Sequence, residues 1–152
     1  MSSHRLLSLI VICAALSSAA SPAKTKADDF LWTAAGGTIG TGNMVYVDLS
    51  RLKRSGKYVR AWVLYDYDEP QRHPNGKAWT SMLLLDEFDC ANIETRGVQT
   101  YLYAAPFGRG EMIDTARTPD AEPTSSPPGS AGDRVLSLVC EKSRNSRSRS
   151  IK

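Results

Sequence analysis

The clearest pattern along the chain is an alternation of apolar and polar side chains at Lys57–Asp68. Val59 and Val63 fall on one side of this segment, whereas Arg60 and Trp62 fall on the other. Alternation with a period of two, together with β-branched and aromatic residues, is typical of a half-buried strand. The segment therefore predicts a long strand with two different faces.

Four further segments have a β-type composition and are expected to form strands. They are Met44–Asp48, Ala78–Cys90, Gly97–Ala104 and Gly110–Thr115. The leucine run at 83–85 would also suit a helix. Turn-forming residues mark 51–57 and 69–76 as loops, and the glycines at 36, 37, 40 and 42 lack the GK[ST] ending of a phosphate loop. Strands joined by short loops favour an antiparallel sheet over alternating β-α-β units.

One helix is expected after the strands. Residues 118–129 are rich in Pro, Ser and Thr, which predicts a surface loop. Ser130 and Asp133 then resemble the start of a capping box, and an apolar stripe follows in which Cys140 lies one turn beyond Leu136. Because a lone sheet cannot bury a core, we expect the helix to pack on its inner face. The prediction is one α+β domain at 21–140.

The first twenty residues have the pattern of a secretory signal peptide. His4 and Arg5 precede an apolar run from Leu6 to Leu16, and small residues follow. This order is typical of a cleaved export signal, and the run is too short to span a membrane, which takes about 20 apolar residues. We expect cleavage after Ala20, with Ala23 as the alternative. The mature chain is then exported, to the periplasm, the cell surface or the medium.

The cysteines agree with export. Cys13 follows Ile12, where a lipoprotein signal needs a small residue, so no lipid anchor is expected. Cys90 and Cys140 are then the only mature cysteines, and in an oxidising compartment they have one intramolecular pairing. Closing a loop of about 50 residues stabilises a fold by about 4 kcal/mol in the chain-entropy model. Two buried free thiols are the alternative. A zinc site is not expected, because the mature chain has too few cysteine and histidine ligands for one.

Few side chains suggest catalysis. His73, the only mature histidine, lies in a loop without a nucleophile motif such as G-x-S-x-G. Asp86, Glu87 and Asp89 form an acidic cluster, but residues 86 and 87 point to opposite faces of a strand, which does not suit a glycosidase pair. We interpret the three acids as solvated edge charges that discourage contacts between sheets. The sequence predicts no enzyme, cofactor or metal site.

An aromatic binding face is one interpretation of the tyrosines. The candidates are Tyr65, Tyr67, Tyr101 and Tyr103, on two of the expected strands. Tyrosines suit binding surfaces because one ring edge is polar. Core packing and cross-strand pairing explain them equally well, so both interpretations stay open.

Charge is distributed unevenly. The formal net charge of +3 comes from 19 Lys and Arg against 16 Asp and Glu, yet the body of the chain is mildly acidic because bases gather at its end. The basic tail at 141–152 carries Lys142, Arg144, Arg147, Arg149 and Lys152. We expect this tail to be disordered. Arginine pairs well with anionic oxygens, so anionic lipid or envelope glycan is a candidate ligand, and a solubilising terminus is the alternative.

A series of short landmarks runs in order from Trp32 to Cys140. They are Trp32, Tyr46-Val47-Asp48, Arg54-Ser55-Gly56, the strand at 59–65, Lys77, Ser81-Met82, Asp89-Cys90-Ala91, Gly108-Arg109-Gly110, Pro128-Gly129-Ser130 and Val139-Cys140. Together they resemble the surface-adhesin protein E-like family of exported bacterial proteins. The resemblance implies a curved antiparallel sheet of about six strands, like half a barrel, with a helix tied across it by a disulfide. It also implies adhesion to extracellular-matrix or serum proteins.

The leading functional interpretation is a non-enzymatic, adhesin-like binding module. It would contact host or envelope proteins or glycans through the sheet face or the basic tail. The alternative is a small periplasmic hydrolase or an enzyme inhibitor, because a fold of this kind does not by itself fix a function. Nucleic acid is not an expected partner, a transmembrane segment is not expected in the mature chain, and a homodimer is left open.

Overall fold

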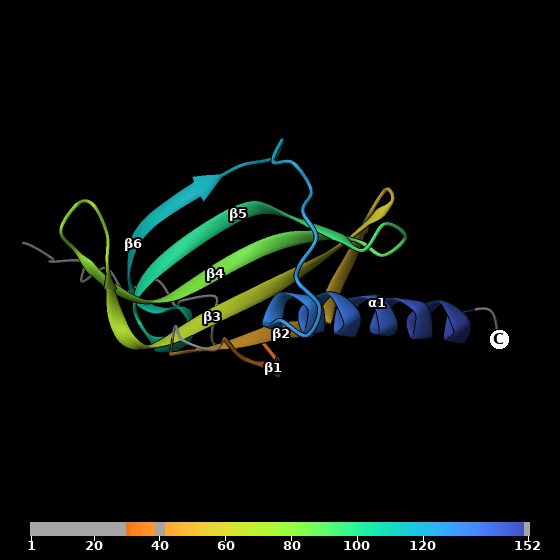
Figure 1. Ribbon diagram of the computed structural model, residues 1–152, viewed down its shortest axis with the longest axis horizontal. Coiled ribbons are helices and arrows are strands. Elements are labelled where there is room, and N and C mark those ends of the chain that lie inside the picture. The colour runs from red at the N-terminus through yellow and green to blue at the C-terminus, as the bar shows by residue number, and fades with distance from the viewer. Residues whose placement is uncertain (1–29, 39–41, 151–152) are drawn as a thin grey trace, which may run out of the picture.

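The computed structural model describes residues 30–38 and 42–150, with side chains as far as residue 146, so the expected signal segment at 1–20 lies outside it. Six strands and one helix form this region (Figure 1). They are β1 (Trp32–Thr38), β2 (Asn43–Ser55), β3 (Tyr58–Arg72), β4 (Ala78–Asp89), β5 (Glu94–Ala105), a 3-10 turn η2 (Pro106–Gly108), β6 (Arg109–Arg117) and α1 (Ala131–Ser150). Neighbouring strands follow the sequence order and every pair is antiparallel. The predicted α+β fold is confirmed.

The strands extend further than the alternation predicts. β2 continues through residues 51–55 and β3 continues to Arg72, so the two expected loops shrink to tight turns. Both extensions follow bulges. Residues 49–52 of β2 lie opposite Ala61 alone, and residues 67–70 of β3 lie between the partners of Ser81 and Trp79. A bulge breaks the period of two while the pairing continues, which makes a strand look like a loop in sequence.

β1 is absent from the sequence-based expectation because its sequence is rich in glycine. Gly36 has a φ of 116°, at a register shift against β2. A Cβ added to Gly36 would lie 2.6 Å from Nη2 of Arg134. The same guanidinium donates hydrogen bonds to the carbonyl oxygens of Ala35 and Gly37. Glycine thus lets an arginine of α1 approach and hold this edge strand.

α1 packs on one face of the curved sheet, which we call the helix face (Figure 1). The buried core there is Ala35, Val45, Val47, Val59, Ala61, Val63, Phe88, Ala131, Val135, Leu136, Val139 and Cys140. Fully burying one such aliphatic side chain contributes about 1.5–3 kcal/mol. The expected cap is also present, because Oγ of Ser130 accepts a hydrogen bond from N of Asp133 at 3.2 Å, and Oδ2 of Asp133 accepts one from N of Gly129 at 2.8 Å.

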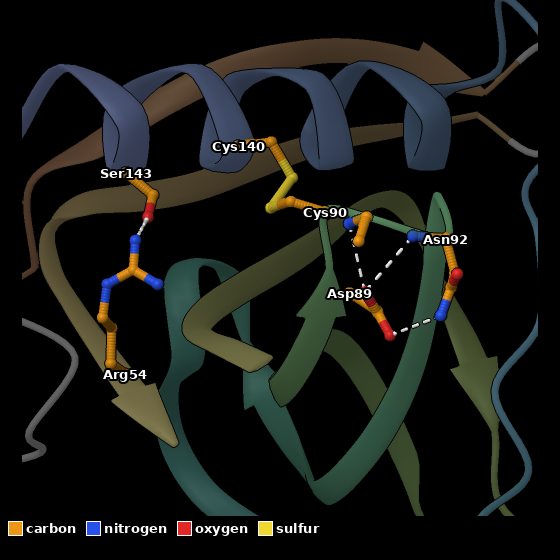
Figure 2. Close-up of a disulfide and its surroundings, with 7 residues drawn as sticks. Arg54, Asp89, Cys90, Asn92, Cys140 and Ser143 are labelled. Carbon is orange, nitrogen blue, oxygen red and sulfur yellow. Dashed lines mark hydrogen bonds between the residues drawn. A yellow bond between two sulfur atoms is a disulfide. The ribbon is translucent and has the colours of Figure 1, made fainter. Parts of the chain in front are cut away.

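Cys90 and Cys140 form a disulfide, with their Cα atoms 5.6 Å apart (Figure 2). Cys90 follows the end of β4, and Cys140 lies on the buried stripe of α1. The predicted pairing is confirmed, and the alternative of two free thiols is excluded. The bond fixes the middle of α1 to the end of a central strand.

The helix continues into the predicted tail, so the expectation of a disordered segment at 141–152 is wrong for residues 141–150. Ser143 is buried, and its Oγ accepts a hydrogen bond from Nη2 of Arg54 on β2 at 2.7 Å (Figure 2). Lysine and arginine are good helix formers, so the helix continues once its first turns are held on the sheet. Residues 151–152 lie outside the described region.

The Pro/Ser-rich loop at 118–129 is attached to the sheet. N of Thr118 donates to the carbonyl of Val98, and Thr124 exchanges two backbone hydrogen bonds of 2.9 Å with Thr95. The loop therefore occupies the part of β5 that β6 leaves unpaired. Within residues 30–38 and 42–150, no helix is long and apolar enough to cross a membrane.

Candidate functional site

The face of the sheet opposite α1, which we call the outer face, carries a wide groove of about 700 Å³. It is lined by Phe30, Ser50, Arg51, Leu52, Lys53, Arg60, Trp62 and Leu85. We call this set the outer groove. Its volume lies within the range of about 300–1,000 Å³ that is typical of ligand sites.

The bulge in β2 builds one wall of the outer groove. Asp48, just before the bulge, is completely buried. Its Oδ1 accepts hydrogen bonds from N and Oγ of Ser50 at 2.8 and 2.6 Å, and Nε of Arg51 lies 3.6 Å from its Oδ2. Bulges redirect side chains out of the regular pleat. Asp48 therefore holds Ser50 and Arg51 in the wall.

Aromatic rings line up beside these polar groups. Phe30 stacks on Trp32 with ring centroids 4.9 Å apart, and it forms a T-shaped pair with Trp62 at a centroid distance of 5.7 Å. Trp62 in turn contacts Tyr101 at 6.1 Å. The guanidinium carbon of Arg51 lies 4.6 Å from the centre of the Phe30 ring, a geometry that favours cation–π attraction. The groove thus combines aromatic surface with positive charge.

Among the residues that the structure describes, the lining of the outer groove contains three bases, Arg51, Lys53 and Arg60, and no acid. Behind it lies Glu87, only 1% exposed, whose two oxygens accept hydrogen bonds from Nε of Arg60 at 2.7 Å and Nε of Arg96 at 2.8 Å. Burial alone would raise the pKa of Glu87, but the hydrogen bonds from Arg96 and Arg60 outweigh it and lower the pKa. Glu87 therefore stays ionised and fixes Arg60 in position.

The three acids of β4 are buried, which corrects the expectation of solvated edge charges. Asp86 is 9% exposed, and Glu87 and Asp89 are each 1% exposed. β4 lies between β3 and β5, so it offers no free edge to solvent. The prediction that residues 86 and 87 point to opposite faces agrees with the pairing of β4.

Asp89 organises the turn that carries Cys90. Its Oδ1 accepts hydrogen bonds from the backbone N atoms of Ala91 and Asn92, and its Oδ2 accepts one from Nδ2 of Asn92 at 2.9 Å (Figure 2). Nζ of Lys57 lies 2.8 Å from the same Oδ2. The hydrogen bond from Lys57, followed by those from the turn, lowers the pKa of Asp89 to about 2. These contacts place Cys90 for its disulfide.

The structure does not bring the predicted aromatic face together from Tyr65, Tyr67, Tyr101 and Tyr103. Tyr101 lies on the outer face beside Trp62. Tyr65 packs against the core of the helix face. Tyr67 follows Tyr65 on the same side of β3 and meets Trp79, with ring centroids 5.1 Å apart. The four tyrosines divide because the register through β4 places those of β3 and β5 out of phase.

His73 lies in the turn between β3 and β4. Its Nδ1 accepts a hydrogen bond from N of Asn75 at 3.3 Å, and its Nε2 lies 3.0 Å from Oδ2 of Asp114. These contacts join the turn to β6. Among the residues that the structure describes, no group of three or more His, Cys, Asp or Glu side chains could hold a metal ion.

Part of the predicted basic tail can be located. Lys142 and Arg144 are exposed on α1, while the side chains of Arg147 and Arg149 and all of Lys152 lie outside the described region. Arg144 lines a separate cleft of about 300 Å³ beside the disulfide, together with Arg54 and Lys57. This cleft shares no lining residue with the outer groove.

The architecture defines a class of small domains in which an open antiparallel sheet carries one C-terminal helix fixed by a disulfide. A profile of the family described as Surface-adhesin protein E matches residues 32–141, from the start of β1 to just past Cys140. The chain belongs to this family. The family match supports a surface adhesin rather than an enzyme.

Solved structures of Haemophilus influenzae protein E show the same fold. One superposes with a TM-score of 0.51 at 18% identity, covering 70% of this chain and 83% of that chain. Another, from crystal form II, gives a TM-score of 0.51 at 17% identity, covering 73% of this chain and 96% of that chain. No curated protein sequence matches the chain significantly.

Sequence reasoning missed the outer groove as a site. The alternation at Lys57–Asp68 does place Arg60 and Trp62 on one face, which is the available signal. The bulge that brings Arg51 and Lys53 beside them lies in a segment that the sequence predicts to be a loop. Pairing across strands was therefore needed to assemble the site.

Proposed function

We propose that this protein is an exported, adhesin-like binding module without enzymatic activity, and that its outer groove binds anionic glycan chains. Membership of the adhesin family supports a surface role. The observation that carries the glycan proposal is the lining of the groove, where three bases and no acid surround Phe30 and Trp62 among the described residues. α1 packs on the other face (Figure 1).

The chemistry of the groove suits sulfated or carboxylated sugars. Guanidinium groups pair with planar anionic groups through two parallel hydrogen bonds, which lysine cannot reproduce. Aromatic rings such as Trp62 offer an apolar surface on which the CH groups of a sugar ring can pack. Glycans of this kind occur on extracellular-matrix and serum proteins and in bacterial envelopes, so one recognition chemistry would serve either setting.

Export is part of this proposal. The apolar run from Leu6 to Leu16, followed by small residues, supports removal of a signal peptide after Ala20 or Ala23. N-terminal sequencing of protein recovered from the periplasm, the cell surface and the medium tests it. Recovery of intact Met1 from the cytoplasm would contradict export, but it would not bear on glycan binding by the outer groove.

Heparin binding by purified mature protein tests the glycan proposal. The double variant Arg51→Gln/Lys53→Gln should bind at least about tenfold more weakly, which is about 1.4 kcal/mol. The matched control is Arg72→Gln/Arg117→Gln, which removes two exposed bases of β3 and β6 outside the groove. We expect the control to bind within about twofold of the parent, because neither base lines the groove and salt screens charges that lie farther from the ligand than about 8 Å. Equal losses in the two variants would mean that net charge alone determines heparin binding, and would contradict the proposal.

A further inference from the structure

The helix face contains a second cleft, of about 200 Å³, between the sheet, the Pro/Ser-rich loop and the start of α1. We call it the helix-face cleft. It is lined by Val63, Tyr65, Leu84, Asp86, Phe88, Thr95, Gly97, Thr124, Ser126, Gly132 and Val135. Thr124 is exposed, whereas Asp86, Phe88 and Val135 are buried, so the cleft runs from the loop at its mouth to a buried base.

Asp86 lies in this cleft without a neighbouring cation among the described lining residues. Its side chain is 9% exposed, and its Oδ1 has no hydrogen-bond partner among the described residues. Within the part of the chain that the structure describes, it is the only Asp, Glu, Lys, Arg or His in the lining, and Tyr65 is the only other titratable group there. Burial raises the pKa of Asp86 to about 7. A buried carboxylate without a partner is unfavourable, so a cation that reached it would relieve a real energetic cost.

The partner of Asp86 on β5 is a glycine, so no side chain of that residue packs against the carboxylate. Asp86 pairs with Gly97 where the register of β4 and β5 shifts by one residue. A Cβ added to Gly97 would lie 3.6 Å from Oδ1 of Asp86, in ordinary van der Waals contact. Glycine therefore places no side chain against Oδ1, which is itself fully buried. An alanine at this position would add a methyl group against Oδ1 without a clash.

We propose that the helix-face cleft binds a small primary ammonium compound, whose ammonium group pairs with Asp86. An ammonium group carries three donors, which the carboxylate and the hydroxyls of Thr95 and Ser126 can accept. Val63, Leu84 and Val135 offer apolar surface for a short alkyl chain, and the Phe88 ring favours a nearby cation. A divalent metal fits poorly, because calcium takes about 6–8 oxygen ligands and the lining has one carboxylate. This inference is independent of the glycan proposal.

An NMR titration of the mature protein with propylammonium chloride tests the proposal. At about pH 8, where Asp86 is mostly ionised, the amides of Thr95 and Gly97 should shift saturably. Propanol, the neutral analogue, should bind at least about tenfold more weakly, and so should propylammonium at about pH 5, where Asp86 is protonated. Asp86→Asn keeps the shape of the side chain, removes the charge and should weaken binding at least about tenfold.

Gly97→Ala provides a second variant that keeps the carboxyl group of Asp86 but adds a methyl group against its Oδ1. It should also weaken propylammonium binding at least about tenfold, with an otherwise unchanged amide spectrum. Parent-like affinity in either Asp86→Asn or Gly97→Ala would overturn the proposal, as would the absence of a saturable shift in the parent protein. Parent-like heparin binding in both variants is expected, which keeps this test separate from that of the outer groove.

Discussion

Two neighbouring acids of β4 have opposite electrostatic environments. Glu87 on the outer face lies between Arg60 and Arg96, which lower its pKa despite burial. Asp86 on the helix face has no such cation among the described lining residues of its cleft, and burial raises its pKa to about 7. The difference arises because successive side chains of a strand point to opposite faces. One strand can therefore hold a fixed charge on one face and a titratable one on the other.

The two faces also differ in how they are stabilised. The helix face is held by an apolar core and by the disulfide between Cys90 and Cys140. The outer face is organised by hydrogen-bonded charges, with Asp48 and Glu87 positioning Arg51 and Arg60. Damage to the helix face should therefore reduce stability, whereas exposed bases of the outer groove can change with little effect on folding.

Loss of the disulfide should have the largest effect. Cys90→Ser should lower the free energy of unfolding by about 4 kcal/mol, because the reduced chain gains loop entropy when it unfolds. Adding Cys140→Ser should cost little more, since the bond is already absent. Chemical denaturation of the three proteins measures this. A loss below about 1 kcal/mol would mean that the apolar stripe of α1 holds the helix without the bond.

Asp86→Asn should show a comparable effect that depends on pH. The folded state retains a proton on Asp86 up to about pH 7, whereas the unfolded chain releases it near the ordinary pKa of 3.8, so stability falls as pH rises between these values. At about pH 8 the variant should be more stable than the parent by roughly 4 kcal/mol, and near pH 4 the two should be similar. Denaturation at a series of pH values measures the difference. Parallel curves for the two proteins would contradict the burial of a lone carboxyl.

Loss of a buried ion pair should lower the free energy of unfolding by a smaller amount, which should still exceed the cost of losing an exposed pair. Glu87→Gln removes the buried charge shared by Arg60 and Arg96, and should cost about 2 kcal/mol because both partners are themselves partly exposed. The matched control is Glu111→Gln, whose pair with Lys77 lies in solvent, and it should cost less than about 0.5 kcal/mol. Urea denaturation compares them. Equal costs would show that the contrast between the two kinds of pair is wrong.

Removal of the chain end should matter least. A protein that ends at Ser146 keeps the contact between Ser143 and Arg54 but loses Arg147, Arg149 and Lys152. Its heparin affinity should fall by less than about threefold at physiological salt, where charges more than about 8 Å apart are screened. Its unfolding curve should match that of the parent. A large loss of affinity would show that the main contact with heparin lies in the basic tail rather than in the outer groove.

The sequence predicts the elements better than the surfaces. The alternation in β3, the capping residues of α1 and the two mature cysteines each depend on local pattern or on simple counting, and these predictions are confirmed. The sequence did not predict β1, because the role of Gly36 becomes clear only from the approach of Arg134 on α1. The prediction of disorder was wrong for residues 141–150 because their helix depends on the packing of the earlier turns of α1 on the sheet. The outer groove and the helix-face cleft depend on register shifts, which local composition does not encode.

The most direct test of the central claim is an NMR titration of the mature protein with a short heparin oligosaccharide. The account predicts that the indole N–H of Trp62 and the amides of Arg51, Lys53 and Arg60 shift saturably, and that Asp86 and the residues of α1 do not. Shifts confined to Arg54, Lys57 and Arg144, or to the end of the chain, would contradict the claim that the outer groove is the binding site.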